Sequence, residues 1–169
     1  MIKRKVCLIG AYAVGKTSLI RQFVSGLFSD GYLTTVGVKI NKRSVTVSDQ
    51  EVLLMIWDLA GRDEFEAVQK SYLRGASGFL YVADGTRRDT LAEVQKEIDL
   101  IVPDHPDTPS LLLLNKCDRE NDWEVEDGDL TGFQEAGIET LLTSAMTGQN
   151  IAEAFDQLTR LMISHDPGN

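Results

Sequence analysis

The sequence has only two cysteines, no long run of apolar residues and fewer basic than acidic side chains. Cys7 and Cys117 are far apart and have no CxxC spacing, so we expect a reduced, intracellular protein without a disulfide framework or a cysteine metal site. No segment approaches the roughly 20 apolar residues that a membrane helix needs. The ending SHDPGN has neither a prenylation cysteine nor a basic cluster. These absences predict a cytoplasmic chain without a lipid anchor, with at most transient membrane association through partners.

The 26 acidic and 17 basic residues give a net charge of −9, which argues against broad electrostatic attraction to nucleic acid. The charge is uneven. Residues 1–50 contain eight basic and two acidic side chains, whereas residues 89–139 contain three basic and fifteen acidic ones. Two interpretations stay open: solvated helix and loop faces, which we favour for most of these residues, or a positive end that faces a polyanionic ligand.

A length of 169 residues, 43% of them apolar, predicts one domain over residues 1–169 with a buried core. Short apolar runs alternate with segments of helical periodicity. The expected strands are residues 5–9, 36–48, 52–57, 79–83, 111–114 and 139–142, the last three buried, and the expected helices lie near 15–25, 65–74, 88–102, 129–136 and 149–163. Strands 36–48 and 52–57 form a hairpin. The alternation predicts an α/β fold: a six-stranded, mostly parallel sheet with one antiparallel edge strand and five helices on both faces.

Residues 10–17 read GAYAVGKT and fit G-x-x-x-x-G-K-[ST] between the first expected strand and the first expected helix. About one chain in 150 of this composition would contain the pattern by chance. Consecutive loop amides and a helix N-terminus offer partial positive charge, and glycine lets the backbone curl around phosphate oxygens. We expect Lys16 to reach the β- and γ-phosphates and the Thr17 hydroxyl to bind Mg²⁺. The motif predicts a P-loop NTPase fold.

Asn115-Lys116-Cys117-Asp118 follows the apolar run 111–114, at the carboxyl end of a strand, where such sheets bind ligands. The Asp118 carboxylate can accept two hydrogen bonds from the N1–H and exocyclic amine of guanine, an edge that adenine does not present. The motif alone is weak, because Asn and Asp often form turns. Together with the P-loop and with Thr143-Ser144-Ala145 after the next strand, it predicts a preference for GTP over ATP.

Asp58-Leu59-Ala60-Gly61 closes the strand 52–57. This D-x-x-G pattern supplies a carboxylate near the Mg²⁺ and a flexible amide for the γ-phosphate. Thr35 is a candidate for a second hydroxyl on the metal, although threonine at the start of a strand is common.

The four motifs, in this order and spacing, resemble a small GTPase of the Ras superfamily over nearly the whole chain, and are most similar to the Rab family. The stretches typical of Rab proteins are YLTTVGV at 32–38, WDLAG at 57–61 and SYLRGA at 71–76. The resemblance implies a molecular switch that binds GTP and GDP with Mg²⁺ and hydrolyses GTP to GDP and phosphate. It implies effectors, exchange factors and GTPase-activating proteins as partners at residues 30–40 and 61–74, no nucleic acid, and a monomer.

The resemblance also assigns roles to single residues. Ser18 would lie beside the α-phosphate, Phe28 would pack on the guanine, and Tyr32 would close over the phosphates. The implied nucleotide-binding residues are Gly10, Ala13, Val14, Gly15, Lys16, Thr17, Ser18, Phe28, Tyr32, Asn115, Lys116, Asp118, Ser144 and Ala145. The implied metal ligands are Thr17, Thr35 and Asp58, and the implied catalytic residues are Lys16, Thr35, Gly61 and Arg62. An exposed apolar effector patch would comprise Ile40, Trp57 and Tyr72, although a packing role is nearly as consistent with Trp57.

Three positions depart from the family pattern. Arg62 stands where the family has a water-positioning glutamine, and a guanidinium group has donors only. It acts either as an arginine finger in cis, worth about 10³ to 10⁵ in rate, or lies in solvent and leaves hydrolysis slow, which we favour because switch loops are mobile. Tyr12 is bulky near the γ-phosphate, so the response to activating proteins is open. Met146 replaces a lysine beside the base, which predicts weaker guanine affinity.

Two functions therefore stay open. The first is a slow GTP-hydrolysing switch, and the second is a GTP-binding interaction module with negligible hydrolysis. An ATP-dependent kinase or transport ATPase is disfavoured by Asp118 and by the absence of a second substrate domain.

Overall fold

The computed structural model describes residues 1–24, 32–33, 38–59 and 66–166, with only the backbone described at 32, 33 and 66–69. The strands are β1 (Ile2–Ile9), β2 (Tyr32–Leu33), β3 (Lys39–Val47), β4 (Gln50–Asp58), β5 (Gly78–Asp84), β6 (Ser110–Asn115) and β7 (Glu139–Leu142). The α-helices are α1 (Lys16–Val24), α2 (Glu66–Leu73), α3 (Asp89–Ile101), α4 (Thr131–Glu135) and α5 (Ile151–Ser164), and two 3-10 turns span Glu120–Asp122 and Asp127–Leu130. The predicted strands and helices are confirmed to within a few residues.

The strands form one sheet in the order β2-β3-β4-β1-β5-β6-β7. Strand β1 is parallel to both β4 and β5, and β6 and β7 continue the parallel part. Strand β3 runs antiparallel to β4 and to β2. The α/β fold is confirmed. The sheet has one strand beyond the six predicted, because the two-residue β2 is too short to show an alternating pattern.

The β3–β4 hairpin turns at Ser48 and Asp49, which have φ values of 51° and 61°. Two consecutive left-handed residues form the turn that best matches the twist of the flanking strands. The hairpin is confirmed, whereas the first residues of the expected strand, 36–37, lie outside the described residues.

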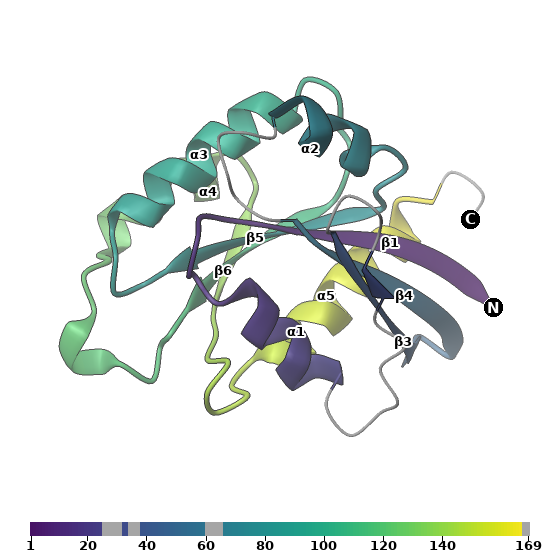
Figure 1. Ribbon diagram of the computed structural model, residues 1–169, viewed down its shortest axis with the longest axis horizontal. Helices are drawn as coiled ribbons and strands as arrows, with labels where there is room; N and C mark the ends of the chain where they lie inside the picture. The colour runs from purple at the N-terminus through teal and green to yellow at the C-terminus, as the bar shows by residue number, and fades with distance from the viewer. Residues whose placement is uncertain (25–31, 34–37, 60–65, 167–169) are drawn as a thin grey trace.

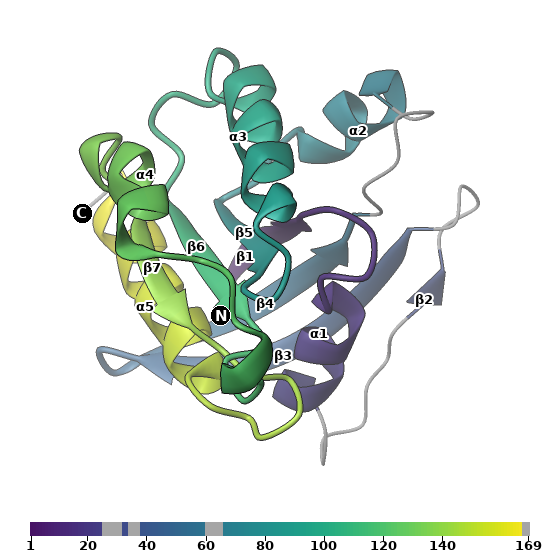
Figure 2. The same cartoon turned by 90° about the vertical axis from the view of Figure 1, so that its left-hand side faces the viewer.

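Helices cover both faces of the sheet (Figure 1): α1 and α5 lie on one side, and α2, α3 and α4 on the other. Alternation along the central strands supplies both cores, since Leu8 faces α1 and α5 whereas its neighbour Cys7 faces the opposite layer. In the first layer Phe23 of α1 and Phe155 of α5 stack with ring centroids 3.9 Å apart. Figure 2 shows β7 beside β6 with no strand beyond it. The prediction that β7 is buried is wrong, because an edge strand is covered on fewer sides and its residues are exposed or half-buried.

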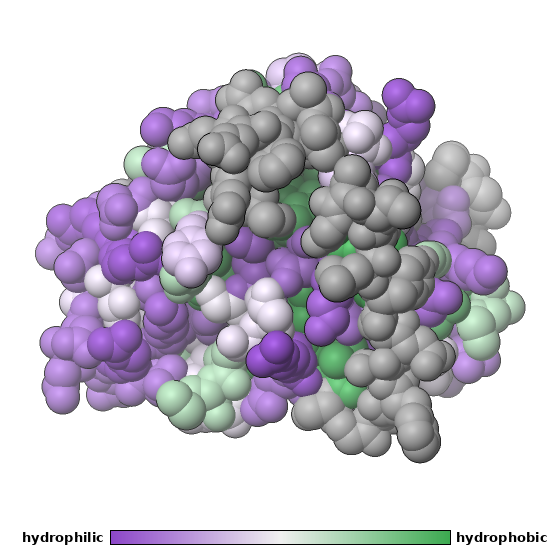
Figure 3. Space-filling view, viewed as in Figure 1, coloured by the Kyte–Doolittle hydropathy of each residue, from purple (hydrophilic) through white to green (hydrophobic). Residues whose placement is uncertain are grey.

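Hydrophilic residues cover much of the face seen in Figure 3, and hydrophobic ones show mainly near its centre. Within the described ranges, none of the helices has the length and apolar character needed to cross a membrane.

Candidate nucleotide-binding site

The predicted motifs meet at one edge of the sheet. The parallel strands β1, β4, β5, β6 and β7 all point their carboxyl ends to this edge. Strand β1 lies between β4 and β5, so the chain proceeds to opposite sides of β1 in its two halves. This is the topological switch point at which open α/β sheets bind ligands.

The P-loop, residues 10–17, requires glycine at both ends of its pattern. A Cβ on Gly10 would lie 2.2 Å from the carbonyl oxygen of Val82, and one on Gly15 would lie 2.3 Å from Asn115 Nδ2. Gly15 also has a φ of 102°, in the left-handed region that side chains disfavour. Ala13 has a φ of 61°. The loop therefore curls tightly against the strands and loops behind it.

Lys16 is buried at the first position of α1, with only 7% of its surface exposed. Its Nζ donates to the carbonyl oxygens of Gly10 at 2.8 Å and Ala11 at 3.2 Å. Burial lowers the pKa of Lys16, and the nearby carboxylates of Asp58 and Glu97 act in the opposite direction. The following residues, Thr17 and Ser18, are exposed at the N-terminus of the helix. The arrangement presents a cation and free helix amides at one point.

The residues predicted to hold Mg²⁺ include one adjacent pair of oxygen groups. Thr17 Oγ1 donates a hydrogen bond of 2.5 Å to Asp58 Oδ2, which joins α1 to the end of β4. A hydroxyl and a carboxylate are the hard oxygen donors that Mg²⁺ takes, and this ion usually keeps several of its waters. The pair fits the ion, whereas the described part of the chain holds no cluster of three or more His, Cys, Asp or Glu for another metal. Thr35 lies outside the described residues.

In the predicted base-reading loop, Asp118 is exposed and is held by a buried serine. Ser144 Oγ donates to Asp118 Oδ1 at 2.7 Å and accepts from the Thr147 amide at 3.1 Å. Ser144 itself is fully buried. The carboxylate predicted to read guanine is therefore fixed in direction while it faces solvent.

Asn115 is buried and connects three loops. Its Nδ2 donates to the carbonyl oxygen of Val14 at 2.9 Å. Its Oδ1 accepts from Thr143 Oγ1 at 3.3 Å and from the Ala145 amide at 3.2 Å. The residue ties the phosphate-binding loop to both loops predicted to hold the base.

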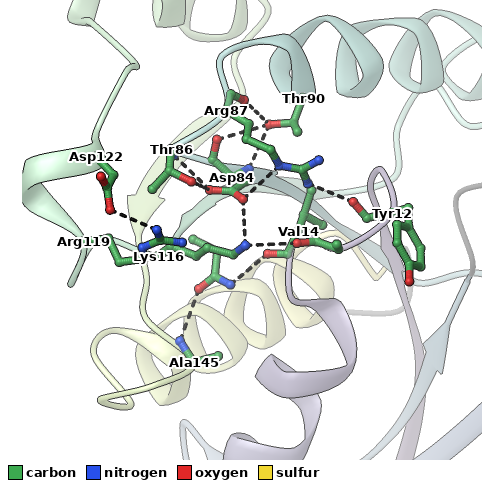
Figure 4. Close-up of polar contacts among 12 residues, drawn as sticks. Tyr12, Val14, Asp84, Thr86, Arg87, Thr90, Lys116, Arg119, Asp122 and Ala145 are labelled. Carbon is green, nitrogen blue, oxygen red and sulfur yellow. Dashed lines mark hydrogen bonds and ion pairs between the residues drawn. The ribbon is translucent and has the colours of Figure 1, made fainter.

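Asp84, which ends β5 and is fully buried, belongs to this site although none of the motifs includes it. Its carboxylate contacts Lys116 Nζ at 2.8 Å and Arg87 Nε at 3.1 Å, and it accepts hydrogen bonds from the Thr86 amide and hydroxyl. Figure 4 shows this cluster beside the P-loop. Burial alone would raise the pKa of Asp84, but the hydrogen bonds from Lys116, Thr86 and Arg87 outweigh it and lower the pKa. The available signal was its place directly after an apolar strand, as for Asp58 and Asn115.

Four predicted site residues lie outside the described residues: Phe28, Thr35, Gly61 and Arg62. For Tyr32 the backbone is placed in β2. Two departures from the family pattern are strongly exposed, Tyr12 at 74% and Met146 at 81%.

The expected effector patch is only partly present among the described residues. Ile40 is buried, with 2% exposure, so its assignment to an exposed patch is wrong: it lies in β3 within the core that contacts α2 and α3. Trp57 and Tyr72 are half-buried, with ring centroids 5.9 Å apart. Lys5 Nζ lies 3.8 Å from the centroid of the Trp57 ring, and it donates to the Arg74 carbonyl at 2.9 Å.

Comparison with known proteins agrees with this geometry. The profile of the Ras family matches residues 5–164. The chain belongs to the Ras family. Its curated relatives include "Ras-related protein Rab-2B" of Dictyostelium discoideum, 34% identical over 94% of this chain and 80% of that protein. "Ras-related protein RABC1" of Arabidopsis thaliana is 38% identical over 91% and 74%, and "Ras-related protein Rab-13" of Canis lupus familiaris is 35% identical over 92% and 78%.

Membership of the Ras family, with Rab-named relatives, identifies the chain as a Rab-like small GTPase, a GTP-binding hydrolase. Ras-family proteins bind guanine nucleotides, generally with Mg²⁺, and generally act with effectors, exchange factors and activating proteins. The resemblance predicted from the four motifs is confirmed.

Proposed function

We propose that this Ras-family chain is a guanine-nucleotide switch whose residues 1–169 act as one domain and whose intrinsic GTP hydrolysis is slow. The observation that supports this most is the meeting of the P-loop, Asp58 and the Asn115–Asp118 loop at one edge of the sheet. Three separate sequence motifs come together there, and each carries the chemical groups that one part of GTP needs.

The phosphates would be held by backbone amides of the P-loop, by Ser18 and by Lys16. Lys16 is already aimed along the loop by the carbonyls of Gly10 and Ala11. Thr17 and Asp58, with Thr35, would hold Mg²⁺, which when bound supplies positive charge beside the β- and γ-phosphate oxygens. The buried ammonium and the helix N-terminus add charge at the same place, which suits a triphosphate.

The guanine would be held by the exposed carboxylate of Asp118, with Asn115, Lys116 and the Ala145 amide around it. Ser144 fixes Asp118 by a hydrogen bond of 2.7 Å, so the carboxylate loses little freedom on binding. Phe28 would pack on the base and Tyr32 would close over the phosphates. A fixed carboxylate favours guanine, which offers two adjacent donors to it.

Slow intrinsic hydrolysis is proposed from Arg62, and an altered response to activating proteins is proposed from Tyr12. A guanidinium group has no acceptor for a proton of the attacking water, so Arg62 lacks half of the function of glutamine. Gly61 would couple the γ-phosphate to the segment that carries Arg62, as Thr35 would from residues 30–40. Tyr12 lies within the P-loop and is 74% exposed, where it would either obstruct an arginine finger supplied by another protein or donate a hydrogen bond to the γ-phosphate.

Partners would contact residues 30–40 and 61–74 of a monomeric switch that works in the cytoplasm, with transient membrane contact through those partners. Lys5 stabilises the end of α2 within this surface, because its Nζ donates hydrogen bonds to the carbonyls of Tyr72 and Arg74. We propose no contact with nucleic acid, in line with the net charge of −9.

The test is single-turnover GTP hydrolysis with Mg²⁺, comparing wild type with Arg62→Gln and with Arg74→Gln as a matched control. We expect Arg62→Gln to hydrolyse GTP at least about tenfold faster, because the amide both accepts and donates. Arg74→Gln should match the wild type. Slower turnover in Arg62→Gln would show instead that Arg62 is a finger in cis.

An interaction module with negligible hydrolysis is the second candidate, favoured by Arg62 and by the exposed Tyr12. It predicts no phosphate release from wild type over many hours and unchanged nucleotide binding. The nucleotide released on denaturing the purified protein checks both candidates, because ATP or ADP in place of GTP or GDP would contradict each.

A further inference from the structure

Three successive carbonyl groups of the P-loop each accept a hydrogen bond from a different side chain. Arg87 donates to the Tyr12 carbonyl at 2.8 Å, Lys116 to the Ala13 carbonyl at 3.1 Å, and Asn115 to the Val14 carbonyl at 2.9 Å. The three donors come from the ends of β5 and β6, far away in the sequence. Figure 4 shows Arg87 and Lys116 on one side of the loop, with the Tyr12 ring turned away from them.

The direction of a carbonyl group fixes the direction of the next amide. In a trans peptide the C=O of one residue and the N–H of the following residue point to opposite sides of the chain, and the described residues contain no cis peptide. The amides of Ala13, Val14 and Gly15 therefore point away from the three donors. Left-handed φ values at Ala13 and Gly15 bring these amides together, as in the concave anion sites known as nests.

Two of the three donors share one anchor, the buried carboxylate of Asp84. Lys116 and Arg87 contact the same oxygen, Oδ2, at 2.8 and 3.1 Å. The carboxylate accepts hydrogen bonds from the amide and the hydroxyl of Thr86. The backbone of Asp84 is held as well, because its amide donates to Thr90 Oγ1 at 2.9 Å. The carboxylate thus fixes both cations in the positions from which they reach the loop carbonyls.

We propose that Arg87 and Asp84 are positioning residues for phosphate binding. Asp84 holds Arg87 and Lys116 in place, and these two cations orient the P-loop carbonyls toward themselves, so that the P-loop amides point toward the phosphates. This role rests on the proposed guanine-nucleotide binding and adds to it a residue pair outside the four motifs. This role requires no contact between Arg87 and the nucleotide. It acts through the Tyr12 carbonyl and therefore through the Ala13 amide.

The test compares Arg87→Ala with Arg88→Ala, its neighbour. Arg88 is half-exposed and pairs with Glu126 and Asp129 instead of the P-loop, so it controls for the loss of an arginine. Affinities for GDP and for GMP are measured for both variants and for wild type. GMP lacks the β-phosphate that the loop amides would hold, so it reports on general damage to the site.

We expect Arg87→Ala to weaken GDP binding roughly tenfold and to leave GMP binding within about twofold of wild type, the difference between them being the one hydrogen bond that orients the loop. Arg87→Lys should recover part of the GDP affinity, and Arg88→Ala should equal wild type. Equal losses for GDP and GMP, or equal GDP affinities of the Arg87→Ala and Arg88→Ala variants, would overturn the positioning role.

A second measurement follows the backbone amides of the P-loop, first in the wild-type protein and then in Arg87→Ala. On addition of GDP, the amide resonances of Ala13, Val14 and Gly15 should all move downfield in a ¹H–¹⁵N spectrum, and the Ala13 amide should move less in Arg87→Ala. Static Ala13–Gly15 amides in a protein that binds GDP would overturn the inference alone. A wild type that binds neither GDP nor GMP would overturn the proposed function as well.

Discussion

In the P-loop, residues 10–17, the hydrogen bonds that shape the site end on backbone carbonyls, as with Lys16 on Gly10 and Ala11. In the base loops, residues 115–118 and 143–149, side-chain oxygens also accept hydrogen bonds, as Asp118 does from Ser144 and Asn115 does from Thr143 and the Ala145 amide. The first kind of site needs glycines and one lysine in a fixed local spacing. The second kind needs residues from different strands to meet. The motif of the predicted phosphate site is therefore local in sequence, although Arg87, Lys116 and Asn115 hold its carbonyls from the ends of other strands. The predicted base site has no such local motif and depends on the meeting of the loops after β6 and β7.

The basic side chains of residues 1–50 show how the charge in this region is used. Several basic side chains of residues 1–50 are engaged inside the fold: Lys5 lies over Trp57, and Arg43 lies 4.1 Å from the centroid of the Phe23 ring. Of the basic residues there, Lys16 is the one that belongs to the P-loop motif. In the proposed site, the buried Lys16 and the backbone amides of the P-loop would supply the positive charge for phosphate locally.

The largest effect is expected when the cation of the predicted phosphate site, Lys16, is removed. Lys16→Ala should weaken GDP and GTP binding by at least about 100-fold, because a charge-assisted contact with phosphate and two loop hydrogen bonds are lost together. Lys96→Ala, which removes an exposed lysine of α3, should bind normally. Affinity is measured by titration with a fluorescent GDP analogue. Wild-type affinity in Lys16→Ala would contradict the assignment of the predicted phosphate site.

The corresponding test of the predicted base site alters selectivity. Asp118→Asn should lower GDP affinity about 100-fold and raise affinity for xanthosine diphosphate, because the amide can donate where the carboxylate only accepts. The Ser144 hydrogen bond can persist on the amide oxygen. Asp122→Asn, whose carboxylate pairs with Arg119 at the surface, is the matched control. Competition binding with the two diphosphates gives the result, and unchanged selectivity would count against a base-reading Asp118.

The smallest effect concerns the link between the predicted phosphate and base sites. Asp84→Asn should lower the free energy of unfolding by about 2 kcal/mol at pH 7, because it removes the buried negative charge that pairs with Arg87 and Lys116. The effect stays moderate because water still reaches part of both cationic side chains. The pKa of Asp84 lies below its ordinary value of 3.8. Its stabilising contribution is therefore complete above about pH 4 and declines as the pH falls through the folded pKa.

The difference between wild type and Asp84→Asn should accordingly be constant from pH 7 to pH 5 and shrink below pH 4. Urea denaturation at each pH measures it. Asp122→Asn should cost less than about 0.5 kcal/mol at every pH, since exposed ion pairs contribute little. If the difference in the free energy of unfolding between wild type and Asp84→Asn grows on acidification, the lowered pKa of Asp84 is contradicted.

By itself the sequence determined that a sheet is covered by helices on both faces, because apolar runs and helical periodicity report local burial. It also determined the P-loop, because Gly10, Gly15, Lys16 and Thr17 lie within eight consecutive residues. It also placed Asp58, Asn115 and Asp118 at strand ends. Only the tertiary structure decided that Ile40 is buried, that β7 is an edge strand, and that Asp84 joins Arg87 and Lys116 to the carbonyls of Tyr12 and Ala13. Such contacts form between residues up to about a hundred positions apart, and no local pattern encodes which strand ends meet.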